Sequence, residues 1–234
     1  LETAEIMKLV DNTYRDVQFA FANEVARVCE VFKINVLDVI SKGKKKFKRT
    51  NLPMPGLVGG PCLEKDPHIF NDSVKFAGLN LEITKSARLV NERQPRETIK
   101  FVSNEIKSRF KNKNIKIALL GMAFKGVPPT SDLRGSMSLK VLKLLEKYYS
   151  KEQIILFDPV IQSHELKKEI SGNFLFTNSL TNAVKNASVV IFANNHPDLS
   201  LLNPFQLYKL MKSNGFIYDY WNLFSNLNLK KLTD

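Results

Sequence analysis

A cysteine in a glycine- and proline-containing stretch is the first residue of this sequence whose surroundings suit chemistry. Cys62 follows the pair Gly59 and Gly60 with one proline between them. Asp66 and Pro67, a few residues later, are typical of the N-cap and the first position of a helix. A thiol near a helix N-terminus and a lysine is a good nucleophile, because its thiolate form is favoured. The paired glycines would let a ligand approach the backbone, and Asp66 could act as a base or orient water.

A structural interpretation of the same residues stays open, in which Cys62 is a small buried thiol beside a capping aspartate. The second cysteine offers a comparison. Cys29 falls on an apolar stripe with the three-to-four spacing of a buried helix face, together with Phe19, Ala22, Ala26 and Phe32. We expect Cys29 to belong to the core.

A lysine and an asparagine near the start of the chain form a second candidate group. Lys8 and Asn12 are four residues apart, so on a helix they point to the same side. Such a pair can donate hydrogen bonds to an oxyanion that develops during a reaction. A lysine on a helix is more often simply solvated, so the spacing alone leaves both interpretations open.

A third candidate group follows the first apolar run of the second half of the chain. Phe124 and Lys125 lie in the loop after the segment that ends at Leu120, where ligands of parallel sheets bind. Lys125 could meet a phosphate, and Phe124 could pack on a ring. The loop lacks the three spaced glycines of a dinucleotide fingerprint. An ordinary loop with surface charges is the alternative.

The elements that must position these residues fall into two parts. Residues 1–42 contain neither glycine nor proline, which permits one long helix and then a short one over 36–41, capped by Asn35. A loop is expected from 43 to 60.

Helical pattern then resumes from about Pro67 to Lys113, with breaks near Gly78 and at Pro95. A helical region without a sheet often packs against a copy of itself, which makes a dimer plausible.

The second part alternates short β-rich runs with helical stretches. The predicted strands are 115–120, 154–157, 173–177, 188–192 and 216–218, and the predicted helices are 137–149, 164–170, 180–185 and 204–212. This alternation favours a parallel sheet covered on both faces. The expected fold class is α/β, with a mostly helical domain over 1–96 and a Rossmann-like domain over 97–234 that begins with a connecting helix to about 113.

The charge balance points to an anionic partner. The 234 residues carry a net charge of +12, from 35 Lys and Arg against 23 Asp and Glu. Nucleic acid, an acidic lipid surface or a phosphorylated small molecule would suit that charge. The densest basic cluster, residues 42–49, is typical of a solvated mobile loop. No zinc-finger or aromatic ribonucleoprotein pattern accompanies it, which disfavours nucleic acid.

Composition narrows the classes further. Two cysteines and three histidines are too few for a disulfide framework or a structural zinc site. No apolar run approaches the length of a membrane helix, and we expect no signal peptide. We therefore expect a cytoplasmic protein without a metal site, a membrane or a nucleic-acid partner.

Taken together, the motifs resemble the UDP-glucose/GDP-mannose dehydrogenase family. The matching residues, in register along the chain, are Ala4-Glu5, Lys8, Asn12-Thr13, Asn23-Glu24, Gly59 to Asp66, Gly121, Ala123 to Lys125 and Asp132 to Arg134. The run from Gly59 to Asp66 most resembles the branch that oxidises UDP-N-acetyl-hexosamines such as UDP-N-acetylmannosamine.

The resemblance implies an NAD-dependent oxidation of the C6 alcohol of a nucleotide sugar to the acid, with two hydride transfers. Cys62 would be the nucleophile that forms a thiohemiacetal and then a thioester. Asp66 would position or activate the hydrolytic water, while Lys8 and Asn12 would stabilise the oxyanion at C6.

The remaining site residues follow from the same resemblance. Phe124 and Lys125 would hold the nucleotide sugar, with Gly59 and Gly60 also facing the substrate, and Arg134 would reach NAD. The basic cluster 42–49 falls where the substrate loop of the family crosses towards a neighbouring subunit.

The sequence also departs from the family pattern. Leu57 stands where the family usually has a glycine, and Glu64 replaces a common proline. These departures leave the identity of the sugar open. Family members begin with a dinucleotide-binding domain, and no Gly-x-Gly-x-x-Gly occurs here. The resemblance therefore implies a fragment, the helical dimerisation domain plus the nucleotide-sugar domain, inactive by itself. A non-catalytic nucleotide-sugar-binding module and a basic nucleic-acid-binding module are the alternatives.

Overall fold

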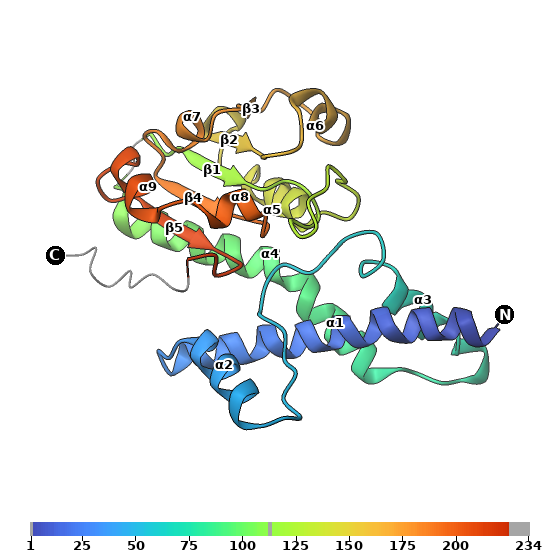
Figure 1. Ribbon diagram of the computed structural model, residues 1–234. Coiled ribbons are helices and arrows are strands. Elements are labelled where there is room, and N and C mark those ends of the chain that lie inside the picture. The colour runs from blue at the N-terminus through green and yellow to red at the C-terminus, as the bar shows by residue number, and fades with distance from the viewer. Residues whose placement is uncertain (1, 112–113, 225–234) are drawn as a thin grey trace. The chain divides into compact units, whose positions relative to one another are not determined.

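The computed structural model describes residues 2–111 and 114–224, which form two compact units, one up to Gln94 and the other from Pro95 (Figure 1). The first unit is helical, and the second contains a parallel sheet. Among the described helices, none has the length and apolar character needed to cross a membrane.

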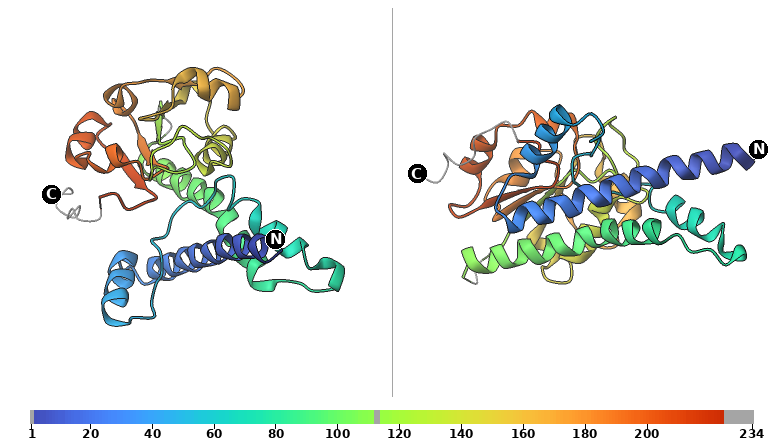
Figure 2. Two further views of the ribbon diagram at one scale, coloured as in Figure 1. Left: turned by 45° about the vertical axis from the view of Figure 1, so that its right-hand side comes forward. Right: turned by 90° about the horizontal axis from the view of Figure 1, so that it is seen from below.

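The first unit is built on the long helix α1 (Glu2–Val31). Its absence of glycine and proline gives the uninterrupted helix that the sequence predicts. Beside it lie α3 (Asp66–Asp72), a short 3-10 turn (Lys75–Ala77) and the first part of α4 (Glu82–Arg109), as Figure 2 shows. Small residues let α1 and α4 approach closely, because the core between them consists of Ala20, Ala87 and Val90 with Val17 at its edge.

The second helix, α2 (Val36–Lys46), begins as predicted, since the Asn35 side chain accepts a hydrogen bond of 2.9 Å from the backbone N–H of Leu37. The predicted end was wrong, because the helix continues through Gly43 to Lys46. Three lysines occupy its last turn, where positive charge is favourable beside the exposed carbonyls. Four of the six basic residues in the cluster therefore lie on a helix and not on a loop.

Two further details correct the expectations for the helices. Pro95 lies inside α4, which continues for 14 residues to Arg109 because the following turns bury Thr98, Ile99, Val102 and Ile106. Phe32 lies beyond the end of α1 and is 70% exposed, whereas Cys29 is buried as expected. The predicted helix end at Lys113 and the first residue, Leu1, fall outside the described residues.

The second unit confirms the predicted α/β architecture. Its strands are β1 (Ile117–Leu120), β2 (Ile154–Phe157), β3 (Leu175–Phe176), β4 (Val189–Phe192) and β5 (Phe216–Asp219). They are all parallel, in the order β3-β2-β1-β4-β5. The edge strand β3 is shorter than predicted because it pairs on one side only and Leu175 is half exposed.

Helices cover both faces of this sheet. The connecting helices are α5 (Met137–Leu145), α6 (Ser163–Glu169), α7 (Leu180–Val184), α8 (Pro197–Ser200) and α9 (Pro204–Leu210), with a 3-10 turn at Lys151–Gln153. Buried side chains of α7, α8 and α9 form one core with β1, β2 and β4. Right-handed crossovers then place α5 and α6 on the opposite face. Helix α8 was not anticipated, because it contains only four residues.

The chain order reverses between the central strands β1 and β4, which lie side by side. At such a switch point the loops that leave the carboxyl ends diverge, and ligands of open α/β sheets bind there. The loop with Phe124 and Lys125 leaves β1 at this edge.

Candidate functional site

A tight turn carries Cys62 on the first unit. Gly60 adopts a positive φ of 95°, which favours glycine, and its carbonyl accepts a 3.1 Å hydrogen bond from the N–H of Glu64. The Cys62 carbonyl accepts from the N–H groups of Lys65 (3.1 Å) and Asp66 (2.8 Å). The Cys62 side chain is exposed. The interpretation of Cys62 as a small buried thiol is therefore wrong.

Asp66 lies one turn after Cys62. The sequence predicts Asp66 as the N-cap of α3, and this prediction is wrong. The helix begins at Asp66 itself, so the capping position belongs to Lys65, whose side chain makes no capping hydrogen bond. The buried Asp66 carboxylate instead accepts a 2.8 Å hydrogen bond from Asn12 Nδ2 on α1. Two of the predicted catalytic residues, 54 positions apart, are thus in direct contact.

Lys8 lies on α1 one helical turn before Asn12, and its side chain is exposed. The spacing of four places both side chains on the same side of the helix. The four predicted catalytic residues therefore all belong to the first unit, with Asn12 and Asp66 joined and with Cys62 one turn away from Asp66.

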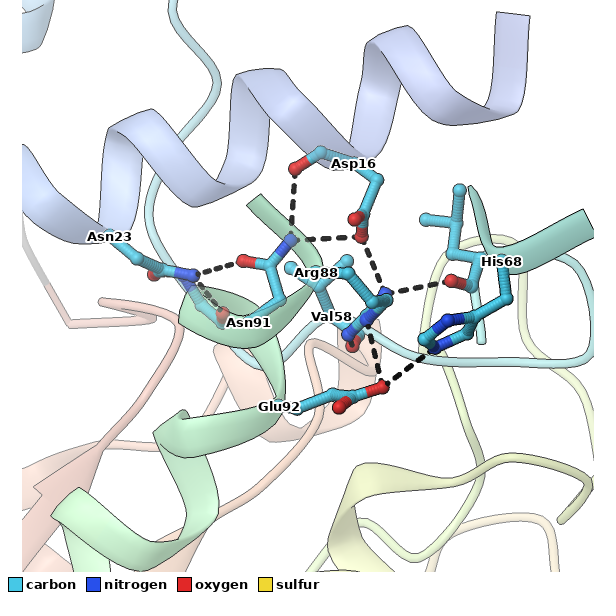
Figure 3. A network of polar contacts seen from close by, with 9 residues as sticks. Asp16, Asn23, Val58, His68, Arg88, Asn91 and Glu92 are labelled. Carbon is cyan, nitrogen blue, oxygen red and sulfur yellow. Dashed lines mark hydrogen bonds and ion pairs between the residues drawn. The ribbon is translucent and has the colours of Figure 1, made fainter. Parts of the chain in front are cut away.

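A buried ion pair, not anticipated from the sequence, lies next to this group. Arg88 Nη1 on α4 is 2.6 Å from Asp16 Oδ1 on α1, and the two side chains are only 3% and 1% exposed (Figure 3). Arg88 also donates to the backbone of the Cys62 loop, through Nη1 to the Leu63 carbonyl (2.7 Å) and through Nη2 to the Val58 carbonyl (3.3 Å). Burial raises the pKa of Asp16, against the opposing attraction of the Arg88 guanidinium.

Two asparagines extend the ion pair into a network (Figure 3). Asn91 Nδ2 donates to both the side chain and the backbone carbonyl of Asp16, each at 2.9 Å, and Asn91 Oδ1 accepts from Asn23 Nδ2 at 3.1 Å. Asn23 in turn holds the backbone of Gly56 through both its N–H (2.9 Å) and its carbonyl (3.1 Å). Side chains of α1 and α4 thus fix the loop that leads to Cys62.

The network reaches the surface on its other side. Glu92 Oε1 lies 3.3 Å from Arg88 Nε and 3.2 Å from His68 Nε2, and His68 belongs to α3 (Figure 3). The loop and the helix that follows Cys62 are therefore both connected to Arg88.

One signal in the sequence could have found this network. Asn12, Asp16 and Asn23 recur at helical spacing together with Ala20, which is a buried position. Polar side chains on a buried helix face need partners, because an unpaired buried polar group is costly. The sequence could predict that need but not the partners, since Arg88 and Asn91 lie about seventy residues away.

On the second unit, Asp158 organises the loop after β1. It directly follows β2, and its carboxylate accepts hydrogen bonds from the N–H groups of Met122 (2.6 Å), Ala123 (3.2 Å), Val160 (2.8 Å) and Ile161 (3.0 Å). The carboxylate thereby fixes the backbone immediately before Phe124. Asp158 was not among the site residues predicted from the sequence.

The loop after β4 packs against the same segment. Asn195 Oδ1 accepts a 3.0 Å hydrogen bond from the Gly126 N–H. A Cβ at Gly126 would lie 2.0 Å from the backbone nitrogen of His196, so only glycine fits. The carboxyl-end loops of β1 and β4 are therefore held together at the switch point.

Phe124 and Lys125 lie in this loop and are both half-buried. The Lys125 ammonium is 5.3 Å from the centroid of the Phe124 ring, within the range of a cation–π contact. An aromatic face and a cation are thus adjacent at the carboxyl edge of the sheet. These two residue types suit a base or sugar ring and a phosphate, respectively.

Arg134 lies further along the same loop region and is exposed. Its guanidinium makes a two-pronged contact with Asp132, with Nε–Oδ1 at 3.0 Å and Nη2–Oδ2 at 2.7 Å. This pairing lowers the pKa of Asp132. Within the described ranges, no cluster of three or more His, Cys, Asp or Glu side chains is arranged to hold a metal ion.

These features define a class of protein in which a helical unit with an exposed cysteine is joined to a Rossmann-like parallel sheet, a type of sheet that binds nucleotides. Comparison with protein families specifies the class. Residues 2–93 match the central domain of the UDP-glucose/GDP-mannose dehydrogenase family, and residues 118–226 match the UDP binding domain of that family. The chain belongs to the UDP-glucose/GDP-mannose dehydrogenase family.

Individual relatives agree with this assignment. The chain is 36% identical over 200 residues to the UDP-N-acetyl-D-mannosamine dehydrogenase of Campylobacter jejuni, covering 84% of this chain and 46% of the relative. It is 29% identical over 238 residues to the UDP-glucose 6-dehydrogenase of Rickettsia conorii, covering 99% and 52%. The solved UDP-D-ManNAc dehydrogenase of Pyrococcus horikoshii superposes with a TM-score of 0.80 at 30% identity, covering 94% and 48%. The chain thus spans about half the length of these relatives.

Proposed function

We propose that this chain serves in an NAD-dependent UDP-sugar 6-dehydrogenase that oxidises the C6 alcohol of UDP-N-acetylmannosamine or a UDP-glucose-type substrate to the acid. The observation that carries the proposal is the buried contact between Asn12 and Asp66 next to the exposed thiol of Cys62. The names of the relatives support the substrate class.

The residues of this chain offer only part of a site for NAD. The sequence has no dinucleotide fingerprint. The exposed Arg134 guanidinium is a suitable partner for a phosphate of the cofactor, in exchange for its contact with Asp132. When bound, each NAD would accept one hydride, so the oxidation of an alcohol to an acid, which releases two hydrides, would use two NAD in turn. The 234-residue chain by itself is expected to bind the nucleotide sugar without turning it over.

Cys62 supplies the covalent chemistry of the second oxidation. Its sulfur adds to C6 of the sugar aldehyde and forms a C–S bond, while the carbonyl oxygen becomes the hydroxyl of a thiohemiacetal. Loss of a hydride from C6, together with release of the hydroxyl proton to water, gives a thioester. Water then attacks C6, the C–S bond breaks, and the acid and the free thiol are released.

Lys8 and Asn12 stabilise the oxygen at C6 each time the carbon becomes tetrahedral. The Asn12 amide carries two N–H groups, so it can donate to Asp66 and to the substrate oxygen together. Asp66 is thereby held by Asn12 with lone pairs left to orient the hydrolytic water.

The nucleotide part of the substrate is assigned to Phe124 and Lys125 on the second unit, with Gly59 and Gly60 close to the sugar. The aromatic face next to a cation supports this assignment. The loop is already fixed by Asp158 and by the β4 loop, so little ordering is left for binding.

A homodimer through the helical unit completes the proposal. Exposed apolar side chains follow a seven-residue repeat along α1, at Met7, Val10, Tyr14, Phe21, Val28 and Val31. A repeat of this kind on one helix face is the seam that a second helix covers in a coiled coil. Light scattering of the chain, compared with a Tyr14→Glu/Phe21→Glu variant, tests it. The chain should have twice the mass of the variant, and equal masses would refute the dimer.

Calorimetric titration of the chain with UDP tests the nucleotide site, with GDP as the comparator and two salt concentrations. Saturable binding that prefers UDP is the expected result, and Lys125→Ala should weaken it at least about tenfold. Failure to bind UDP would contradict the assignment. Affinity for RNA that falls steeply with salt and ignores free UDP would instead indicate a nucleic-acid-binding module.

A further inference from the structure

The Arg88 guanidinium holds the backbone on both sides of Cys62. It donates to the Val58 carbonyl, four residues before the cysteine, and to the Leu63 carbonyl, directly after it. Both carbonyls belong to a loop that has no strand or helix to satisfy them. A buried side chain therefore provides what secondary structure provides elsewhere.

Arg88 is itself fixed from two further directions (Figure 3). Asp16 on α1 binds Nη1 at 2.6 Å, and Glu92 on the same helix lies 3.3 Å from Nε. Because the guanidinium is planar and its donors point in fixed directions, these contacts determine where the two loop carbonyls lie relative to α1.

The same helix α1 carries Lys8 and Asn12, and Asn12 holds Asp66 on the far side of the Cys62 turn. The segment around Cys62 is thus connected to α1 at two points. Before α3, Arg88 connects it to Asp16, and at Asp66, the first residue of α3, Asn12 holds it directly. A shift of Arg88 would move the thiol relative to the two groups that are proposed to meet the substrate oxygen.

We propose that Arg88 is a positioning residue that sets the conformation of the Cys62 loop and so aligns the thiol with Lys8 and Asn12. The alignment of the thiol with Lys8 and Asn12 rests on the proposed function, whereas the conformation of the loop does not depend on it. Lysine cannot replace Arg88 in this role. Its ammonium is a single point of charge that can pair with Asp16 but does not span two separated carbonyls.

Amide hydrogen exchange of the 234-residue chain, with Arg88→Lys as the variant, tests whether Arg88 sets the conformation of the Cys62 loop. The amides of Glu64, Lys65 and Asp66 are bonded within the turn, so they report its opening. We expect them to exchange at least about tenfold faster in the variant, since two hydrogen bonds to the loop are lost. The Gly56 amide is held by Asn23 and should change less than about threefold. Arg93→Lys, an exposed neighbour on α4, is the matched control and should change neither.

A second variant covers the case in which Arg88→Lys does not fold. Asp16→Asn/Arg88→Gln removes both buried charges at once, so no buried charge is left without a partner, and the partly exposed Glu92 keeps its contact with His68. The same three amides should accelerate in that variant. Unchanged exchange in either folded variant would overturn the proposal. Equal acceleration at Gly56 and along α1, or unfolding of both variants, would also overturn it, because Arg88 would then support the fold as a whole.

Two readouts keep this proposal separate from the proposed function. Cys62→Ser should leave the exchange of the three amides unchanged, because the thiol takes no part in the contacts between Arg88 and the loop. In Arg88→Lys, the UDP affinity should stay within about twofold while the covalent addition of a UDP-sugar 6-aldehyde to Cys62 falls at least about tenfold. Faster amide exchange with unimpaired covalent addition would mean that Arg88 sets the loop conformation but does not align the thiol for the reaction.

Discussion

The buried pair of Asp16 and Arg88 should respond asymmetrically when one partner is removed. Asp16→Asn leaves a guanidinium that is 3% exposed and cannot lose its proton. Breaking a buried pair costs about 3–5 kcal/mol of unfolding free energy, and we expect the lower end, about 3 kcal/mol. The reason is that Glu92 Oε1 remains 3.3 Å from Arg88 Nε.

Arg88→Met leaves the opposite charge, which can be neutralised. Burial already raises the pKa of Asp16, and loss of the guanidinium removes the main influence that lowers it. The folded state then keeps a proton that the unfolded chain releases above about pH 4. The unfolding free energy of the variant therefore falls as the pH rises from about 4 to the raised pKa of Asp16 in the folded state, by up to about 1.4 kcal/mol per pH unit. Its deficit relative to the parent should shrink between pH 7 and pH 5, whereas that of Asp16→Asn should not.

Urea unfolding at the two pH values measures both effects. Far-UV circular dichroism follows the helices of both units, and Trp221, the single tryptophan of the sequence, reports on the second unit alone and serves as an internal control. Asp38→Asn removes an exposed pair with Lys42 and should cost less than about 1 kcal/mol. Equal, pH-independent deficits for the two buried variants, or a cost below about 1 kcal/mol for Asp16→Asn, would show that Asp16 and Arg88 do not form a stabilising buried pair.

Three further predictions concern the second unit. Asp158→Ala releases four backbone N–H groups and should weaken UDP binding at least about tenfold, as calorimetry would show; unchanged affinity would exclude a role in ordering the loop. Gly126→Ala places a Cβ 2.0 Å from the His196 backbone and should cost more than about 2 kcal/mol by Trp221-monitored unfolding. Gly43→Ala on α2, where a Cβ would meet Thr50 Cγ2 at an ordinary 3.6 Å, should keep Trp221 unfolding unchanged. Burial raises the pKa of Tyr220 well above 10, so the unfolded state loses this proton first and stability falls as the pH rises above about 10. Tyr220→Phe should flatten that fall by about 1.4 kcal/mol per pH unit, and an unchanged slope would contradict it.

The elements that the sequence predicted well are those with a strong local signal. Helix α1 follows from a long stretch free of glycine and proline, and the central strands follow from short apolar runs such as Ile154–Phe157. Cys29 is buried because it lies on the apolar face of α1. In each case the information lies within a few residues of the element itself.

The errors arise where distant residues override a local preference. Pro95 does not end α4, because the buried residues of the following turns outweigh one missing N–H. Asp66 binds Asn12 instead of capping α3. The partners of Asp16 could not be predicted, because Arg88 and Asn91 come from a helix about seventy residues away and no local pattern joins them. The chemical roles of Lys8, Asn12, Cys62, Asp66, Phe124, Lys125 and Arg134 stay predictions.

Carbon NMR can detect the covalent addition of a substrate aldehyde to Cys62. The chain would be mixed with a UDP-sugar 6-aldehyde enriched with carbon-13 at C6, which needs no NAD to reach the thiohemiacetal. A new resonance of a carbon bonded to sulfur should appear, disappear on addition of excess UDP, and be absent in Cys62→Ala. Retention of that resonance in Cys62→Ala, or an aldehyde that binds and remains free or hydrated in the parent chain, would contradict the account.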